Sequence, residues 1–183
     1  FIGAGDVSDL HARAVQSCRG AELKGLWNRT VSKAESKAAH FGCRHYETAQ
    51  ELIADPAIGA VFVLTNLETH FYYTSLALKG GKHVLVEKPA GVDTREIAEM
   101  QRLAADRKLF CVPGHNYIYE EGLIRTRELI RGGNLGQLIS VYVLYNIHHA
   151  EEIASRYPGV IRQILTHHCY ILLFLAGSVE RLG

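Results

Sequence analysis

Apolar and polar positions follow two different rhythms along this chain. Up to about residue 114, short apolar runs such as GAVFVLT at 59–65 alternate with segments whose apolar residues recur every three to four positions. A run that is apolar throughout is typical of a strand buried on both faces of a parallel sheet, whereas the wider spacing is typical of a helix. The alternation predicts an α/β fold built on a doubly wound parallel sheet, with helices on both faces.

The elements predicted in this first part can be given by residue range. Gly42 directly follows one helical segment and is expected to end it, because glycine readily adopts the left-handed conformation of a helix C-cap. The predicted strands are 1–2, 21–28, 44–47, 59–65, 82–87 and 109–114, and the predicted helices are 6–18, 31–42, 48–54, 68–80 and 94–107.

A second domain is predicted to begin near residue 117. The pattern indicates a long amphipathic helix at 119–133, an alternating strand at 137–148 and an apolar helix at 160–177. We therefore assign 1–116 to the first domain and 117–183 to the start of a second α/β domain that the chain does not complete. The first strand is likewise expected to begin before Phe1, because strands usually have about 5 residues.

Composition narrows the classes of function. The formal net charge is +1, with 20 basic and 19 acidic residues that are well mixed, so neither a nucleic-acid nor a membrane surface is indicated. The four cysteines show no close pairing, which favours reduced thiols and a cytoplasmic protein. A targeting segment before Phe1 would not be visible in this sequence.

A G-x-G turn lies between the first predicted strand and the first predicted helix. Gly3 permits the tight turn, and Gly5 leaves room for a pyrophosphate against the backbone. The helix N-terminus, with Asp6 and Val7, offers N–H donors and the positive end of the helix dipole. The third small position of the fingerprint holds Ser8. In this βαβ context the turn predicts a dinucleotide site in a Rossmann-type fold.

The end of the second strand bears on which dinucleotide binds. An NAD site usually has an acidic residue about 20 residues past the fingerprint, where it accepts hydrogen bonds from the ribose. Here Asn28 lies at that position, and Arg29 and Thr30 follow it. Asn28 would not repel a 2′-phosphate, and Arg29 could bind one through its guanidinium group. We therefore favour NADP over NAD, with a polar turn carrying a solvated arginine as the alternative.

The segment HVLVEKP at 83–89 ends a strand with an acid, a base and a proline. Taken alone, it could be a solvated ion pair followed by a helix breaker. Together with the G-x-G turn and the stretches 55–89 and ELIRGGNLGQLISV at 128–141, it resembles the glucose–fructose oxidoreductase/inositol dehydrogenase (Gfo/Idh/MocA) family. The resemblance covers nearly the whole chain. It implies a Rossmann domain followed by an α/β domain whose open sheet covers the active site and often forms dimers.

The resemblance implies roles for several residues of the first domain. Lys88 would lie beside the nicotinamide and the substrate hydroxyl, where a fixed ammonium group stabilises a developing alkoxide. Pro89 would follow a cis peptide bond, and Glu87 would help to hold the cofactor ribose. The loop after the fourth strand, which would lie along the cofactor, contains Thr65, Asn66 and His70.

The second-domain motif of the family, D-x-G-x-H-x-x-D, is only partly matched. The resemblance places its histidine at His167, which would act as acid and base, with His168 as the alternative if the register shifts by one. Gln163, Leu165 and Tyr170 replace the first acid, the glycine and the last acid. Without the family register, His167 would be interpreted as a core histidine on an apolar helix.

Two functions remain open. The first is an NADP-dependent oxidoreductase that moves a hydride to or from a carbinol or carbonyl carbon of a sugar, cyclitol or related molecule. Its substrate would contact Lys88, His115, Asn116, Gln163 and His167, and the complete protein would form a homo-oligomer through the second domain. The alternative is a cofactor-binding sensor or regulator without catalysis, which the loss of both acids favours. We expect no metal site, because adjacent histidines on a strand point to opposite faces and no spacing fits zinc.

Overall fold

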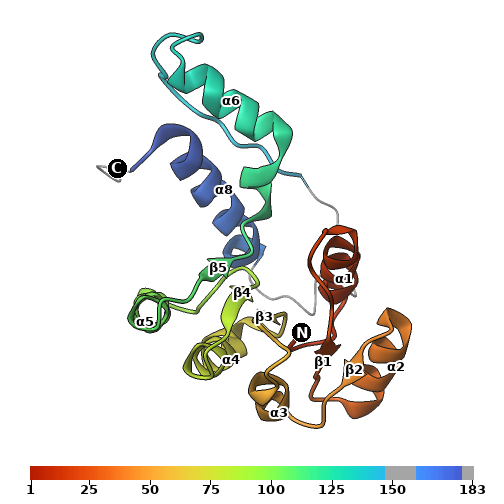
Figure 1. Cartoon of the computed structure of the whole chain (residues 1–183). Helices are drawn as coiled ribbons and strands as arrows, with labels where there is room; N and C mark the ends of the chain where they lie inside the picture. Colours follow the sequence, from red (N-terminus) through yellow and green to blue (C-terminus); the bar gives the residue numbers. More distant parts are fainter. Residues whose placement is uncertain (147–159, 179–183) are drawn as a thin grey trace. The chain divides into compact units, whose positions relative to one another are not determined.

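The computed structural model describes residues 1–146 and 160–178, with side chains described for 1–146 and 164–178. The chain divides into two compact units, residues 1–114 and 115–183 (Figure 1). The boundary predicted from the sequence, after residue 116, lies close to this division.

The first unit is built on parallel strands. Ile2 forms parallel bridges to Trp27 on one side and to Val63 on the other, so it lies between β1 and β3. The resulting order, β2-β1-Ile2-β3-β4-β5, is the doubly wound order with its reversal point between Ile2 and β3, and the predicted fold class is confirmed. The strands are β1 (Gly25–Leu26), β2 (Arg44–His45), β3 (Ala60–Val63), β4 (His83–Val86) and β5 (Cys111–Pro113).

Helices connect these strands at the predicted places. Gly42 ends α2 in the left-handed conformation, with φ of 68°, as its position in the sequence predicts. Asp93 caps the N-terminus of α5 by accepting hydrogen bonds from the N–H groups of Arg95 and Glu96. The helices of this unit are α1 (Val7–Ser17), α2 (Val31–Phe41), α3 (Ala49–Ala54), α4 (Leu67–Lys79) and α5 (Thr94–Asp106).

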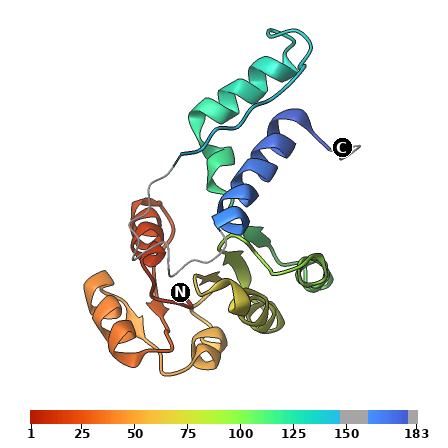
Figure 2. The ribbon, with the colours of Figure 1, turned by 180° about the vertical axis from the view of Figure 1, so that it is seen from behind.

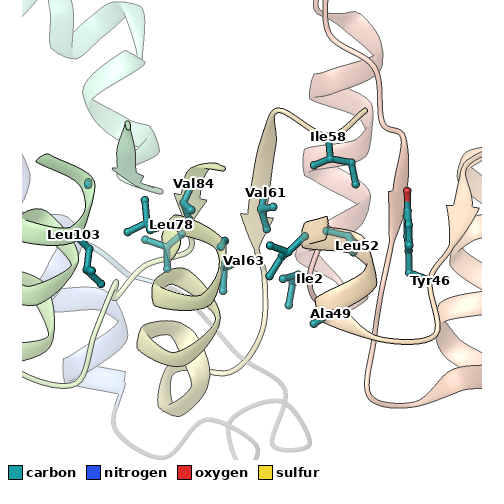
Figure 3. Packing of buried hydrophobic residues seen from close by; sticks show 14 residues of the cluster. Ile2, Tyr46, Ala49, Leu52, Ile58, Val61, Val63, Leu78, Val84 and Leu103 are labelled. Carbon is teal, nitrogen blue, oxygen red and sulfur yellow. The ribbon is translucent and has the colours of Figure 1, made fainter. Parts of the chain in front are cut away.

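The main core lies between the sheet and the helices that cover one of its faces. Figure 3 shows Ile2, Val61, Val63 and Val84 meeting in it, with Leu78 of α4. These side chains are at most 2% exposed. Burying an aliphatic side chain of this size contributes about 1.5–3 kcal/mol, so this core holds in place the loops that follow Ile2 and β3.

The second unit contains η1 (Asn116–Tyr119), α6 (Glu121–Arg131) and α8 (Val160–Ala176). Helices α6 and α8 pack against each other, as both ribbon views show (Figure 2). The guanidinium group of Arg127 on α6 lies 4.2 Å from the ring centre of Phe174 on α8.

The prediction of a strand at 137–148 is wrong for residues 137–146, which form no regular element; its last two residues lie outside the described ranges. Ile139 and Tyr142 are 93% and 92% exposed. An alternating pattern produces a strand only when a neighbouring strand accepts its backbone hydrogen bonds, and no described strand pairs with this segment. Within the described parts of the chain, every helix is too short or too polar to reach across a lipid bilayer.

Candidate functional site

The glycine turn has one crowded side and one open side. Gly3 has φ of +108°, and a Cβ atom there would lie 2.6 Å from the carbonyl oxygen of Leu64. Gly3 is therefore required both by its backbone conformation and by the close approach of the loop after β3. A Cβ atom on Gly5 would meet nothing within 4 Å. The open side at Gly5 leaves space for a ligand next to the backbone.

Helix α1 begins two residues after this turn. Asp6 is its N-cap residue and Val7 its first residue. The first amides of a helix have no acceptor within the helix and form its positive end. Ser8 is fully buried, and its hydroxyl donates to the carbonyl oxygen of Gly5 at 2.6 Å. This internal hydrogen bond explains how a serine fits at a position where the fingerprint usually has a smaller residue.

Asn28 joins the end of β1 to the glycine turn. Its Oδ1 accepts a hydrogen bond from the backbone N–H of Ala4 at 3.1 Å, and its Nδ2 donates to the carbonyl oxygen of Thr30 at 3.2 Å. Asn28, which is predicted to bind the cofactor, therefore also fixes the backbone of the loop around it.

A cavity of about 260 Å³ opens beside Asn28 and the glycine turn. Arg29 and Lys33 line it, and neither has an acidic partner among the described side chains. Tyr73 of α4 lines it as well, and burial raises the pKa of this tyrosine above its usual value. Sequence analysis missed Lys33, although its place in the first turn of α2, four positions after Arg29, was a usable signal. The other lining residues are Gly3, Ala4, Gly5, Trp27, Asn28, Thr30, Leu64, Thr65, Asn66 and Thr69.

The loop after β3 borders the same cavity. Asn66 is the N-cap residue of α4, and the hydroxyl of Thr69 donates to the hydroxyl of Thr65 at 2.8 Å. His70 is buried, with Nε2 2.8 Å from the carbonyl oxygen of Thr65 and Nδ1 2.8 Å from that of Pro89. His70 therefore ties the loop after β3 to the loop after β4. Its predicted contact with a cofactor stays a prediction.

The loop after β4 carries the acid, the base and the proline. The Lys88–Pro89 peptide bond is cis, as predicted. Glu87 Oε1 lies 2.8 Å from Nε2 of His11 on α1, and Oε2 accepts the backbone N–H of Lys88 at 3.0 Å. Burial alone would raise the pKa of Glu87, but the hydrogen bonds from His11 and from the Lys88 amide lower it below its usual value. No described carboxylate forms an ion pair with the ammonium group of Lys88.

These residues fit a dinucleotide, which the fold implies. The open side of Gly5 and the start of α1 suit a pyrophosphate. The adjoining cavity, with Arg29 and Lys33, suits the adenosine end and an additional phosphate. No group of three or more His, Cys, Asp or Glu among the described residues is arranged to hold a metal ion.

In the second unit, His167 and Tyr170 form a buried pair. Nδ1 of His167 lies 2.6 Å from the hydroxyl oxygen of Tyr170. The ring of His115 stacks on Tyr170, with centroids 4.2 Å apart, and the ring of Tyr117 meets His167 edge to face at 4.8 Å. Asn116 also reaches this group, with its Oδ1 3.5 Å from the Tyr170 hydroxyl. Three predicted substrate residues, His115, Asn116 and His167, are thus brought together within this unit.

The remaining candidates of the second unit are less well defined. His168, the alternative acid and base, has a buried Nε2 atom without a hydrogen-bond partner among the described residues. The side chain of Gln163 lies outside the described side chains. The hydroxyl of Tyr117 interacts with that of Tyr145, and this hydrogen bond, together with burial, raises the pKa of Tyr117 to about 12.

The strand order, the glycine turn and the adjoining cavity define a dinucleotide-binding Rossmann protein. The family model described as "Oxidoreductase family, NAD-binding Rossmann fold" matches residues 1–115. The chain therefore belongs to this family, the Gfo/Idh/MocA oxidoreductases.

Individual relatives agree with this membership. Glucose-6-phosphate 3-dehydrogenase of Bacillus subtilis is 32% identical over 143 residues, which are 78% of this chain and 40% of that protein. Inositol 2-dehydrogenase of Rhizobium meliloti is 25% identical over 180 residues, covering 97% of this chain and 54% of that protein. Among solved structures, apo scyllo-inositol dehydrogenase from Lactobacillus casei shares the fold, with a TM-score of 0.84 and 22% identity over 96% of this chain and 53% of that chain. The chain thus spans about half the length of such relatives.

Proposed function

We propose that this chain forms the cofactor-binding part and the start of the substrate domain of an NADP(H)-dependent oxidoreductase. The reaction would transfer a hydride to or from a carbinol or carbonyl carbon of a sugar, cyclitol or related polyhydroxylated molecule. The names of the relatives, dehydrogenases of a sugar phosphate and of inositol, support this substrate class. The domains would be 1–116 and 117–183, and a homo-oligomer would form through the second.

The proposed preference for NADP rests on two positively charged side chains in the cavity beside Asn28. Arg29 and Lys33 line that cavity without acidic partners among the described side chains, so both can bind a 2′-phosphate. An aspartate or glutamate in place of Asn28 would repel that phosphate, and the neutral amide does not. The guanidinium of Arg29 can donate two parallel hydrogen bonds, whereas the ammonium of Lys33 adds a point charge.

The chemical roles follow from the two loops and from the second unit. When bound, the nicotinamide ring supplies the hydride acceptor or donor. The ammonium group of Lys88 would stabilise negative charge that develops on the substrate oxygen, because no described carboxylate forms an ion pair with it. His167 would exchange the proton of that oxygen. His115, Asn116 and Gln163 would contact the substrate hydroxyl groups.

Cofactor titration tests the first half of this proposal. Nicotinamide fluorescence would follow the binding of NADPH and NADH to the purified full-length protein. We expect NADPH to bind more tightly by about tenfold or more, which is about 1.4 kcal/mol. Arg29→Ala and Lys33→Ala should each weaken NADPH binding and leave NADH binding nearly unchanged. Arg19→Ala, at an exposed position away from the cavity, is the matched control. An equal loss of affinity for NADPH and for NADH in Arg29→Ala and Lys33→Ala would contradict the proposed phosphate site.

Turnover tests the second half. The full-length protein would be assayed with NADPH and NADP⁺ against a panel of sugars, sugar phosphates and cyclitols and their keto forms. Lys88→Met should lower turnover by at least about 100-fold with little change in NADPH affinity, because the ammonium group acts mainly on the developing charge. Turnover within a factor of a few of the wild type would show that Lys88 does not carry the proposed role.

One observation favours the alternative, a cofactor-binding sensor without catalysis. The hydrogen-bond partner seen for His167 is the neutral hydroxyl of Tyr170. Tyr170 stands where the motif of the family has an acid, and its hydroxyl, unlike a carboxylate, carries no charge that would compensate a protonated histidine. Tight NADPH binding without oxidation of NADPH by any carbonyl compound of the panel would support the sensor.

A further inference from the structure

Glu87 is anchored at the end of β4, and its carboxylate is enclosed by neighbours in the first unit. The backbone N–H of Glu87 donates to the carbonyl oxygen of Val63 on β3 at 3.0 Å. Oε1 of Glu87 lies 2.8 Å from Nε2 of His11 on α1, and a Cβ atom on Gly114 would lie 3.3 Å from the same oxygen. The Glu87 side chain is therefore held at a fixed place beside the sheet, where it is only 16% exposed.

The second carboxylate oxygen holds the backbone of Lys88. Oε2 of Glu87 accepts the backbone N–H of Lys88 at 3.0 Å. Because a peptide group is planar, a fixed N–H direction also fixes the plane of the peptide bond between Glu87 and Lys88. On the other side of Lys88, Nδ1 of the buried His70 lies 2.8 Å from the carbonyl oxygen of Pro89. The main chain at Lys88 is thus held from both directions, which limits the positions that its ammonium group can reach.

The acid and the base of this loop do not form an ion pair with each other. Burial would raise the pKa of Glu87, but the hydrogen bonds from His11 and from the Lys88 amide outweigh it, so the carboxylate is ionised at neutral pH. Hydrogen bonds to an ionised acceptor are stronger than those between neutral groups. The carboxylate therefore acts on the backbone of Lys88, and the ammonium group stays available to a substrate oxygen.

We propose that Glu87 is a positioning residue that fixes the backbone of Lys88 and, through it, the place of the Lys88 ammonium group. This role differs from the contact with the cofactor ribose that the resemblance implies for Glu87. A ribose ligand would contribute to cofactor affinity, whereas a residue that positions Lys88 would contribute to turnover. The inference rests on the proposed function for its meaning in catalysis.

Two substitutions at position 87 separate these roles in the full-length protein. Glu87→Met has a side chain of similar length and lacks the carboxylate. Glu87→Gln keeps one oxygen, which can accept the Lys88 N–H while its amide group donates to Nε2 of His11. We expect turnover to fall by about tenfold or more in Glu87→Met, and most of it to return in Glu87→Gln.

Cofactor titration of the same variants gives the second readout. The affinity of Glu87→Met for NADPH should stay within about twofold of the wild type, because the proposed role does not include a cofactor contact. Glu99→Met, which removes a carboxylate that pairs with Arg102 on the surface of α5, is the matched control and should change neither turnover nor affinity. Weaker NADPH binding with unchanged turnover at saturating NADPH in Glu87→Met would overturn the inference and favour the ribose contact.

The hold on the backbone can be measured without any turnover, by amide hydrogen exchange resolved to single residues. We expect the Lys88 amide to exchange about tenfold or more slowly in the wild type than in Glu87→Met, as the loss of one charge-assisted hydrogen bond allows. The amide of Val84, which donates to the carbonyl oxygen of Phe110, should exchange alike in both proteins. A Lys88 amide that exchanges in the wild type as fast as in an unstructured peptide would overturn the inference, and this result needs no variant.

The exchange measurement also separates this inference from the proposed function. A protected Lys88 amide in a protein that turns over no sugar or cyclitol of the panel would support the hold of Glu87 on Lys88 and count against the oxidoreductase. Turnover by a protein whose Lys88 amide exchanges freely would support the oxidoreductase and overturn the role of Glu87.

Discussion

Nε2 of His11 lies 2.8 Å from Oε1 of Glu87, and this contact joins the first helix to the loop that carries Lys88. The side chains of His11 and Glu87 are only 18% and 16% exposed. The His11 ring also packs edge to face on Phe1 and Phe62. The helix that would receive the pyrophosphate and the loop that would reach the nicotinamide are thus tied together by one partly buried hydrogen bond.

We expect His11→Phe to destabilise the protein by about 1–3 kcal/mol at pH 7, because the ring contacts remain and the carboxylate of Glu87 loses its donor. The lowered pKa of Glu87 stabilises the fold above the usual glutamate range, and this contribution is lost as the pH falls through that lowered pKa. The difference in unfolding free energy between the wild type and His11→Phe should therefore shrink as the pH falls below about 4. Urea unfolding at a series of pH values measures this difference in unfolding free energy.

The matched control is His40→Phe, which changes an exposed histidine on α2. It should lower the stability by no more than about 0.5 kcal/mol at any pH. A gap for His11→Phe that does not depend on pH would mean that the ionised Glu87 carboxylate does not stabilise the loop.

Local patterns predicted the fold where burial on both faces leaves a clear signature. The apolar run at 59–65 became β3, and the run at 82–87 became β4, since a central parallel strand has no polar face. The strand predicted at 137–148 did not form over residues 137–146, because alternation shows that a segment could form a half-buried strand, but not that a neighbouring strand is present to pair with it.

A site residue could be predicted from the sequence where it belongs to a single short motif that explains its role. Gly3 and the cis bond before Pro89 belong to such motifs. The partner of Glu87 does not, because His11 is 76 positions away and nothing in its own helix marks it. The bond from Ala4 to Asn28 likewise spans 24 positions. Such partners follow from strand order and packing, which local patterns do not contain.

The two glycines of the turn should respond differently to alanine. Gly3→Ala forces a side chain into positive φ and against the Leu64 carbonyl, so a loss of about 2 kcal/mol or more in unfolding free energy is expected. Gly5→Ala meets open space, and its stability should change by less than about 1 kcal/mol. If the pyrophosphate approaches the backbone at Gly5, this second variant should still bind NADPH about tenfold more weakly.

Urea unfolding and NADPH titration of both glycine variants separate folding from binding. For Gly5→Ala, the urea unfolding curve is the control for the NADPH titration, because this variant is expected to fold normally. Wild-type NADPH affinity in Gly5→Ala would show that the ligand does not use the open side of the turn.

Lys82 is a stabilising residue at the opposite ends of the strands. Its ammonium group is buried and donates to the carbonyl oxygens of Asp55 at 2.8 Å and Ile58 at 2.7 Å. Lys82→Met should lower the unfolding free energy by about 2 kcal/mol, because it removes the donor of the buried Ile58 carbonyl group and one of the two donors of the Asp55 carbonyl group, which also accepts from the backbone N–H of Ile58. NADPH affinity should stay unchanged, since Lys82 precedes β4 whereas Lys88 follows it. Lys79→Met, at an exposed position of α4, is the control in urea unfolding and should have little effect.

Asn28→Asp tests how the cofactor preference is set. The new carboxylate can still accept the hydrogen bond from Ala4, so the glycine turn should keep its shape. It cannot donate to Thr30 as the amide does, and it adds a negative charge beside Arg29. We expect NADPH to bind about tenfold more weakly and NADH to bind as well as before or better, because a carboxylate repels the 2′-phosphate and accepts from the ribose hydroxyls.

Fluorescence titration with both cofactors measures the shift in preference. Gln101→Glu, which makes the same amide-to-carboxylate change on the exposed face of α5, should leave both affinities unchanged. If Asn28→Asp weakens NADH as much as NADPH, the amide is needed for the shape of the loop, through its bond to Thr30, and does not select the phosphate. If only the binding of NADPH is weakened, the charge at position 28 decides which dinucleotide the cavity accepts. Arg29 and Lys33 then bind the 2′-phosphate, which a negative charge at position 28 would repel.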